Sequence, residues 1–230
     1  MEIKNEKCRK NLFIGFYNYG VILTYLSVVS AIIGIYFSVG GNDSPNPLIG
    51  VICLLISGIC DAFDGTVART RKNRTKEDKM FGSRIDSLSD LIAFGVAPTA
   101  IGFGMKLNRW FFIPVFAFYV LCALIRLAYF DVTEEIRTQD ENCGKRTYYE
   151  GLPVTNSALI IPFFYFIATM FPAYSLGMTI TMIIGYVIVA VAFISNFKMV
   201  KLDAKNIVFV ILIAAIIFAI LIAIKLVVLN

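Results

Sequence analysis

The chain has 230 residues, of which 58% are hydrophobic and 16% are charged, with a formal net charge of +5 and a mean hydropathy of +0.77. A soluble domain cannot bury this much apolar surface, so the composition excludes the soluble classes and indicates an integral membrane protein. The sequence contains no histidine, so acid–base or metal chemistry must rest on carboxylates, which favour hard cations such as Mg²⁺ or Mn²⁺.

Seven hydrophobic stretches are long enough to cross roughly 30 Å of hydrocarbon. The expected spans cover about residues 15–38, 48–70, 81–105, 109–131, 152–171, 175–196 and 206–229. The predicted fold is therefore an all-α, polytopic bundle of about seven transmembrane helices. It forms a single membrane-embedded domain over residues 1–230, with a core at 15–196 and an additional C-terminal span at 206–229.

Basic residues alternate between dense and sparse connections. The N-terminal segment "MEIKNEKCRKN" carries four lysines and arginines, the loop "SVGGNDSPNP" after the first span carries none, and the loop after the second span carries five. The positive-inside rule then predicts a cytoplasmic N-terminus and a cytoplasmic loop 70–80, in a multi-pass protein of the cell membrane. Basic residues next to spans act as topology signals or contact anionic lipids, so we expect no nucleic-acid partner.

Aspartates gather where the second span ends in "DAFDGTVAR" and the third begins with "GSRIDSLSD". Asp61 and Asp64 are three residues apart, and Gly82, Asp86 and Asp90 follow one another at intervals of four, so each set lies on one helix face. The two helices are antiparallel neighbours. We therefore expect four carboxylates to meet just below the cytoplasmic surface of the membrane.

A lone aspartate near a helix end is usually solvated, a cap or an ion-pair partner. Four clustered carboxylates repel one another and need cations between them, and ionisable residues within spans tend to mark function. Arg69 and Arg84 could neutralise two of them, but a divalent metal site explains the arrangement better. The small residues Gly65, Ala68 and Gly82 on the same surfaces favour either close helix packing or room for a ligand against the backbone.

The chain resembles the CDP-alcohol phosphatidyltransferases through the ordered pattern Asp61-x-x-Asp64-Gly65-x-x-Ala68-Arg69 … Gly82-x-x-x-Asp86-x-x-x-Asp90. The stretches "GSRIDSLSDLIAFGVAPT", "RLAYF" and "YYEGLPVTNSA" are similar to the bacterial and archaeal phosphatidylserine synthase branch of that family. The likeness covers roughly residues 15–170. Two departures stand out: the loop between Arg69 and Gly82 is longer than the family usually has, and the first span has Asn18 and Thr24 without the family's usual proline.

The resemblance implies transfer of a phosphatidyl group from CDP-diacylglycerol to L-serine, with release of CMP, by a homodimer whose active site faces the cytoplasm. It implies that Asp61, Asp64 and Asp86 bind Mg²⁺ or Mn²⁺. For Asp90 it leaves two roles open, a further metal ligand or the general base, and favours the general base. The residues that it assigns to the CDP end of the donor are Asp61, Gly65, Ala68, Arg69 and Gly82.

Candidates for binding the acceptor or a phosphate lie in later segments. Arg126 is too deep in its span for an ordinary loop cation; it either snorkels, pairs with a carboxylate such as Asp131, or binds the serine carboxylate or a donor phosphate. Arg84 is a second candidate cation. Glu150 is either a solvated loop residue or a partner for the serine ammonium. Two further polar groups enter the fifth span: Thr155 and Asn156.

Two alternatives stay open. Another member of the same family would use glycerol 3-phosphate, inositol or inositol phosphate as acceptor, and the phosphorylated acceptors should require a denser basic pocket than serine does. A divalent-cation transporter would need polar groups along the full depth of the membrane, and the sixth and seventh predicted spans offer almost none.

Overall fold

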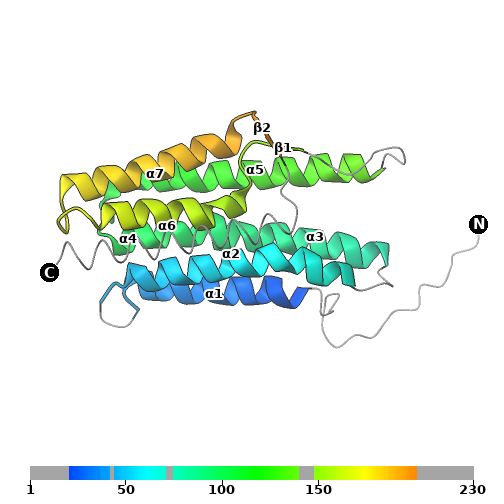
Figure 1. The fold of residues 1–230 in the computed structure, drawn as a ribbon, viewed down its shortest axis with the longest axis horizontal. Coiled ribbons are helices and arrows are strands. Elements are labelled where there is room, and N and C mark those ends of the chain that lie inside the picture. Colours follow the sequence, from blue (N-terminus) through cyan, green and yellow to red (C-terminus); the bar gives the residue numbers. More distant parts are fainter. Residues whose placement is uncertain (1–20, 42–43, 71–74, 140–147, 201–230) are drawn as a thin grey trace, which may run out of the picture.

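The computed structural model describes residues 21–41, 44–70, 75–139 and 148–200. Helices laid along one common axis make up most of this part of the chain (Figure 1). In chain order the elements are α1 (Ile22–Val39), α2 (Pro47–Thr70), α3 (Lys76–Asp90), the π-helical segment η2 (Leu91–Val96), α4 (Ala97–Gly104), the 3₁₀ turn η3 (Trp110–Phe112), α5 (Ile113–Gln139), β1 (Tyr148–Glu150), the 3₁₀ turn η4 (Val154–Asn156), α6 (Ser157–Ala168), α7 (Leu176–Ile194) and β2 (Lys198–Val200).

Within the described residues, five helical stretches are long and apolar enough to cross a membrane: Ile22–Val39, Pro47–Gly65, Met80–Gly104, Trp110–Arg137 and Leu176–Ile194. They confirm the second, third, fourth and sixth predicted spans, and the first span from Ile22 onward, because its residues 15–20 lie outside the described part. The predicted fifth span, about 152–171, corresponds to a shorter apolar helical stretch, Val154–Ala168. The residues before it are held in extended and turn structure. The predicted seventh span, 206–229, lies outside the described residues.

Several helix ends lie together at one end of the bundle. The end of α2, the start of α3 and the end of α5 lie toward this end, while the pair of β1 and β2 lies nearer the middle (Figure 1). The placement of the connections between these elements in the cytoplasm stays a prediction from the basic residues. The N-terminal basic segment and residues 71–74 of the basic loop lie outside the described residues.

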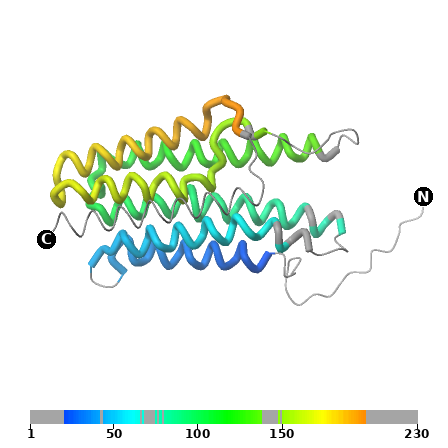
Figure 2. The backbone as a smooth tube through the Cα atoms, viewed as in Figure 1, coloured from blue at the N-terminus to red at the C-terminus, as the bar shows by residue number. Residues whose placement is uncertain are grey.

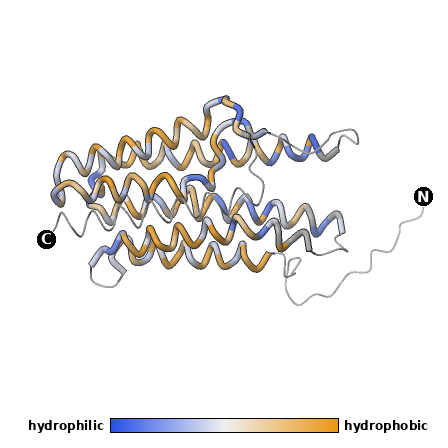
Figure 3. The backbone as a smooth tube through the Cα atoms, in the orientation of Figure 1, coloured by the Kyte–Doolittle hydropathy of each residue, from blue (hydrophilic) through white to orange (hydrophobic). Residues whose placement is uncertain are grey.

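The outer surface of the bundle is apolar. Large hydrophobic side chains are about half exposed along α1 and α5, among them Ile22, Val29, Leu121 and Ile125. Figure 3 shows apolar residues along most of the bundle and polar residues gathered in α3 and the end of α5. An exposed surface of this kind is solvated by lipid, so the chain is a multi-pass membrane protein.

Small and hydroxyl-bearing residues bring α1 and α2 close together. A Cβ added at Gly34 would lie 2.8 Å from the Cβ of Cys53. Ser30 donates its hydroxyl to the Cys53 carbonyl at 2.9 Å, and Ser57 donates to the Ser27 carbonyl at 3.0 Å. Close contact and hydrogen bonds of this kind are how helices associate in lipid. They fix the rotation of α2, and therefore the direction in which its aspartates point.

Aromatic residues fill the centre of the bundle between α4, α5 and α7. The rings of Tyr119 and Tyr186 lie 5.4 Å apart, and Phe193 packs 5.7 Å from Tyr119. All three side chains are fully buried. Gly102 makes room for this packing, since a Cβ there would lie 2.6 Å from the ring of Phe116.

One short antiparallel pair, β1 and β2, accompanies the helices of this all-α fold. Glu150 pairs with Lys198, and the next residue, Gly151, has a φ of +74° that favours glycine. Its N–H donates to the carbonyl of Phe197 at 2.7 Å. The tube in Figure 2 shows this segment passing beside the chain that leaves α7 before it enters α6. The pair therefore fixes the position of Glu150.

Candidate functional site

The aspartates of α2 and α3 come together between the two helices, as their spacing predicted. One carboxylate oxygen from each of Asp61, Asp86 and Asp90 lies within 4.8 Å of the others. Across the helix pair, Asp61 contacts Asp90 and Asp64 contacts Asp86. Asp61, Asp86 and Asp90 are half-buried, while Asp64 is buried. The cluster is thus enclosed by protein on several sides and lies at the end of two membrane-crossing stretches.

Asp64 is held by a residue from a third helix. The hydroxyl of Thr24 in α1 donates to the Asp64 carboxylate at 3.2 Å, and both residues are buried. This bond fixes one carboxylate oxygen of Asp64. Thr24 had no role assigned from the sequence, because the proline that usually accompanies this threonine in the family is missing here.

A capping box sets where α3 begins. The Thr75 hydroxyl accepts from the N–H of Asp78 at 3.1 Å, and the Asp78 carboxylate accepts from the N–H of Thr75 at 3.3 Å. Such a reciprocal pair satisfies two of the N–H groups that a helix start leaves without partners. With the start of α3 fixed, the four-residue spacing places Asp86 and Asp90 on the face toward α2.

The carboxylate cluster fits a divalent metal ion. It offers several hard oxygen donors at short range, which is the ligand set that Mg²⁺ and Mn²⁺ prefer. Like charges at this spacing repel, so a cation between them stabilises the arrangement. The three oxygens that converge most tightly belong to Asp61, Asp86 and Asp90. The sequence assignment named Asp64 in place of Asp90 as a ligand, and the individual roles stay predictions.

The residues assigned to the CDP end of the donor lie on the last turns of α2 and the first turns of α3. Gly65 is exposed and Gly82 is partly exposed. Ala68 and Arg69 lie near the end of α2, and their side chains lie outside the described part of the structure. The backbone therefore places all four positions at the same end of the α2–α3 pair as the carboxylate cluster.

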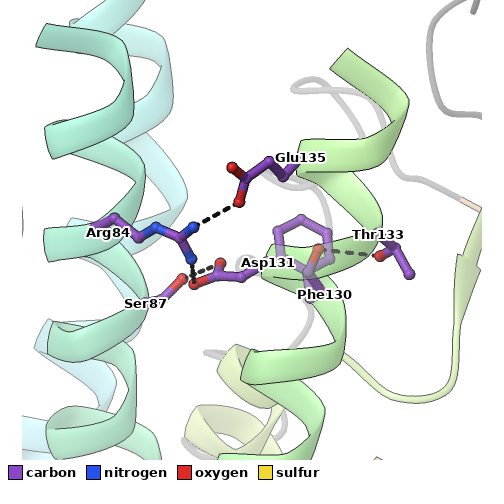
Figure 4. A network of polar contacts seen from close by, with 6 residues as sticks. All are labelled: Arg84, Ser87, Phe130, Asp131, Thr133 and Glu135. Atoms are coloured by element: carbon purple, nitrogen blue, oxygen red, sulfur yellow. Dashed lines mark hydrogen bonds and ion pairs between the residues drawn. The ribbon is translucent and has the colours of Figure 1, made fainter. Parts of the chain in front are cut away.

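Arg84 forms ion pairs with α5 (Figure 4). Its guanidinium lies 3.2 Å from the Asp131 carboxylate and 2.6 Å from that of Glu135. Ser87 donates to the other oxygen of Asp131 at 2.6 Å. The Arg84 side chain is 54% exposed, so this network lies at the rim of the bundle. Arg84 therefore pairs with carboxylates of α5, and these contacts do not support the alternative in which it neutralises one of the four clustered aspartates.

Arg126 is buried in the bundle, with 5% of its surface exposed. Its Nε donates to the carbonyl of Leu152 at 3.2 Å, and its guanidinium lies 5.9 Å from the centre of the Phe130 ring. This burial disfavours snorkelling, which would bring the charged group to the membrane surface. Arg126 therefore connects α5 to the segment that precedes α6.

Glu150, Thr155 and Asn156 lie in that same segment. Glu150 in β1 accepts a hydrogen bond from the Tyr129 hydroxyl of α5. Thr155 and Asn156 belong to η4 and are half-buried. Because η4 packs against both α2 and the π-helical segment η2, the acceptor candidates lie beside the helices that carry the aspartates.

Sequence reasoning also missed Ser87 and Tyr129. Each is a single hydroxyl whose partner lies 44 or 21 residues away in the chain. Local spacing gives no signal for such contacts, since they depend on how distant elements pack.

The sequence is similar to known CDP-alcohol phosphatidyltransferases. The sequence matches the family model described as CDP-alcohol phosphatidyltransferase over residues 17–193. It is 44% identical over 109 residues to the CDP-diacylglycerol–serine O-phosphatidyltransferase of Saccharomyces cerevisiae, across 46% of this chain and 38% of that protein. It is 32% identical over 145 residues to the archaetidylserine synthase of Methanothermobacter thermautotrophicus, across 63% of this chain and 56% of that protein.

A third relative is covered more fully. The chain is 28% identical over 176 residues to the CDP-diacylglycerol–serine O-phosphatidyltransferase of Helicobacter pylori, across 72% of this chain and 69% of that protein. By contrast, the matched region spans less than two thirds of the yeast and Methanothermobacter proteins.

Proposed function

The chain belongs to the CDP-alcohol phosphatidyltransferase family, and on that premise we propose that it transfers a phosphatidyl group from CDP-diacylglycerol to L-serine, giving phosphatidylserine and CMP. The observation that carries the proposal is the convergence of the Asp61, Asp86 and Asp90 carboxylates at the ends of two membrane-crossing stretches. A lipid donor keeps its acyl chains in the bilayer and presents its diphosphate at that level. The names of the yeast and Helicobacter relatives support serine as the acceptor.

The CDP end of the donor would be bound by Asp61, Gly65, Ala68, Arg69 and Gly82. Gly65 and Gly82 carry no side chain, so a nucleotide can approach the backbone closely there. Arg69 would give forked hydrogen bonds to the diphosphate. The position of all these residues at one end of α2 and α3 supports this assignment.

Asp61, Asp64 and Asp86 would hold Mg²⁺ or Mn²⁺. When bound, such an ion offsets the charge of the diphosphate and stabilises the charge that develops on the departing CMP. Thr24 assists by fixing the Asp64 carboxylate. Without a cation, these carboxylates would repel the anionic donor.

Asp90 would act as the general base. It takes the proton of the serine hydroxyl, whose oxygen forms a bond to the lipid-side phosphorus while the bond from that phosphorus to the CMP oxygen breaks. The absence of histidine from the sequence leaves a carboxylate to do this. Asp90 is the last residue of α3, and the segment η2 that follows it packs against η4, which carries two of the acceptor candidates.

The serine would lie between α5 and the segment before α6. Arg126 would pair with its carboxylate and Glu150 with its ammonium, while Thr155 and Asn156 offer further hydrogen bonds. Arg84 is a second candidate for a phosphate oxygen, in competition with its ion pairs to α5. We place the site at the cytoplasmic face of the cell membrane, in a homodimer.

The test is an acceptor panel with the purified full-length chain. The protein is mixed with CDP-diacylglycerol and Mg²⁺ or Mn²⁺, and CMP release is measured with L-serine, glycerol 3-phosphate, inositol and inositol phosphate. Serine should support release and yield phosphatidylserine. Release with another acceptor but not with serine would make the acceptor assignment wrong, whereas a lack of release with any acceptor would contradict the whole proposal.

A further inference from the structure

The third membrane-crossing stretch is interrupted directly after Asp90. α3 ends at that residue, the π-helical segment η2 covers Leu91–Val96, and α4 follows. The N–H of Ala97 bonds to the carbonyl of Ile92, five residues earlier, where a regular α-helix bonds four residues earlier. A single π-helical turn inserts a residue into the helix, and such turns occur frequently at functional sites.

Pro98 removes one N–H group that a regular helix would use at this point. In a regular helix the carbonyl of Phe94 would accept from the N–H of residue 98, and proline has no N–H. Phe94 is fully buried, with 0% of its surface exposed. A buried carbonyl without a donor is costly, above all in a protein surrounded by lipid, so it needs a donor from elsewhere.

Two side chains from two other helices supply that donor. The hydroxyl of Tyr119 in α5 donates to the Phe94 carbonyl at 2.7 Å, and the hydroxyl of Ser157, the first residue of α6, donates to it at 3.3 Å. A carbonyl oxygen has two lone pairs and accepts both. Tyr119 and Ser157 are each 0% exposed, so solvent does not compete for these bonds.

This one carbonyl therefore joins three helices about one turn away from Asp90. Tyr119 lies on the same helix as Arg126, and Ser157 directly follows Asn156 in the chain. The elements that carry the acceptor candidates are thus hydrogen-bonded to the helix that carries the proposed base.

We propose that Tyr119 and Ser157 are positioning residues, which hold the π-helical turn after Asp90 and so aim the Asp90 carboxylate at the acceptor hydroxyl. The inference rests on the proposed role of Asp90 as the general base. Displacing a reacting group by about 1 Å can cost roughly a hundredfold in rate, so small changes at this carbonyl should be visible in turnover.

The test compares Tyr119→Phe with a matched control, Tyr186→Phe. The Tyr186 hydroxyl donates to the carbonyl of Pro98 at 2.6 Å, and Tyr186 is also 0% exposed. Both variants therefore lose one buried hydroxyl from a carbonyl of the same membrane-crossing stretch, but of the two hydroxyls only that of Tyr119 is bonded to a carbonyl of the π-helical segment. Each full-length variant is purified, and kcat, the KM for serine, the KM for CDP-diacylglycerol and the thermal midpoint are measured.

We expect Tyr119→Phe to lower kcat by about tenfold or more with an unchanged KM for CDP-diacylglycerol, and Tyr186→Phe to stay within about twofold of wild type. Ser157→Ala should lower kcat, and Ser157→Thr, which keeps a hydroxyl, should restore most of it. If Tyr119→Phe does not fold, the difference between these two Ser157 variants decides the matter.

Three results would overturn the inference. One is an equal loss of kcat in Tyr119→Phe and Tyr186→Phe that follows the fall in thermal midpoint, since this indicates general packing. Another is a raised KM for the donor with kcat unchanged. The third is equal kcat in Ser157→Ala and Ser157→Thr.

Asp90→Asn, measured in parallel, separates this inference from the proposed function. If Asp90→Asn keeps the wild-type kcat, the assignment of the base is wrong and the positioning role fails with it. If Asp90→Asn is inactive while Tyr119→Phe has the wild-type kcat, the base stands and only the positioning role is wrong.

Discussion

Two sides of the site are built differently. The carboxylate side (Asp61, Asp64, Asp86 and Asp90) comes from two consecutive helices, and its side chains contact mainly one another. The second side, which we propose binds the acceptor and call the acceptor side (Arg126, Glu150, Thr155 and Asn156), comes from a third helix and the irregular segment before α6. There, Arg126 and Glu150 are held by protein partners.

This difference affects how a binding function can be assigned to each side. Carboxylates held together against their mutual repulsion have no evident structural benefit, so their convergence indicates that they bind positive charge. The charged groups of the acceptor side stabilise the fold through hydrogen bonds as well. A substitution there can therefore change folding and binding together, and experiments have to separate the two.

The largest effect is expected on the carboxylate side. Asp61→Asn should abolish CMP release and weaken Mn²⁺ binding, because the metal site loses an anionic ligand. Binding is measured by titration with Mn²⁺, and a chelator should likewise stop the wild type until Mg²⁺ or Mn²⁺ is added. Glu135→Gln removes one negative charge from the rim and serves as the control, which should remain active. Full wild-type activity in excess chelator would contradict the metal site.

Asp90→Asn should show whether Asp90 acts as the general base or as a metal ligand. We expect kcat to fall by about 10²- to 10⁴-fold, with Mn²⁺ binding and the KM for CDP-diacylglycerol close to wild type. Steady-state kinetics and the same Mn²⁺ titration measure this. If metal binding is lost together with turnover, Asp90 is a ligand, which the convergence of its oxygen with those of Asp61 and Asp86 also allows.

On the acceptor side, Arg126→Ala should raise the KM for serine steeply. Losing a buried charge partner costs about 3 kcal/mol, or roughly a hundredfold in affinity. The thermal midpoint should fall too, since the bond to the Leu152 carbonyl is lost. A fall in stability without a change in the KM for serine would make Arg126 purely structural. Loss of donor binding alone would assign it to the lipid phosphate.

Thr24→Val tests how far the carboxylate side depends on its one described partner from α1. Valine keeps the shape and removes the hydroxyl that donates to Asp64 at 3.2 Å. One lost hydrogen bond is worth about 1 kcal/mol, so the apparent affinity for Mn²⁺ should fall by about fivefold. Thr24→Ser retains the hydroxyl and should restore it. Equal affinities in the two variants would show that the bond does not orient Asp64.

The smallest effect is expected at Arg84. Its side chain is 54% exposed at the rim of the bundle, where it pairs with Asp131 and the exposed Glu135, and pairs with an exposed partner contribute up to about 1 kcal/mol. Arg84→Gln should therefore change the KM values for serine and CDP-diacylglycerol by less than about fivefold. A rise as large as that of Arg126→Ala would instead place Arg84 in contact with a substrate.

The carboxylate side and most of the spans could be predicted from the sequence. Span length follows from the thickness of the bilayer, and spacings of three and four residues place aspartates on one helix face whatever the rest of the chain does. The prediction that the aspartate-bearing faces of α2 and α3 contact each other required only that the two helices be consecutive and antiparallel.

The remaining features depend on contacts between distant segments. Arg84 pairs with residues 47 and 51 positions away, and β1 pairs with a strand near residue 200. Three-residue strands carry no periodic pattern, and the short α6 is as apolar as a full span. The proline at residue 98 is visible in the sequence, but the hydroxyls that compensate for it lie on two other helices.

The pairing of β1 with β2 has a consequence for how the protein is made. β2 comprises Lys198–Val200, after α7, so β1 gains its partner only when the ribosome has passed that point and α7 has left the translocon. The last aspartate of the carboxylate side, by contrast, is synthesised at residue 90. A nascent chain therefore carries the acids of the carboxylate side long before Glu150 has its neighbouring strand. We expect Glu150 to reach its final surroundings late in biosynthesis.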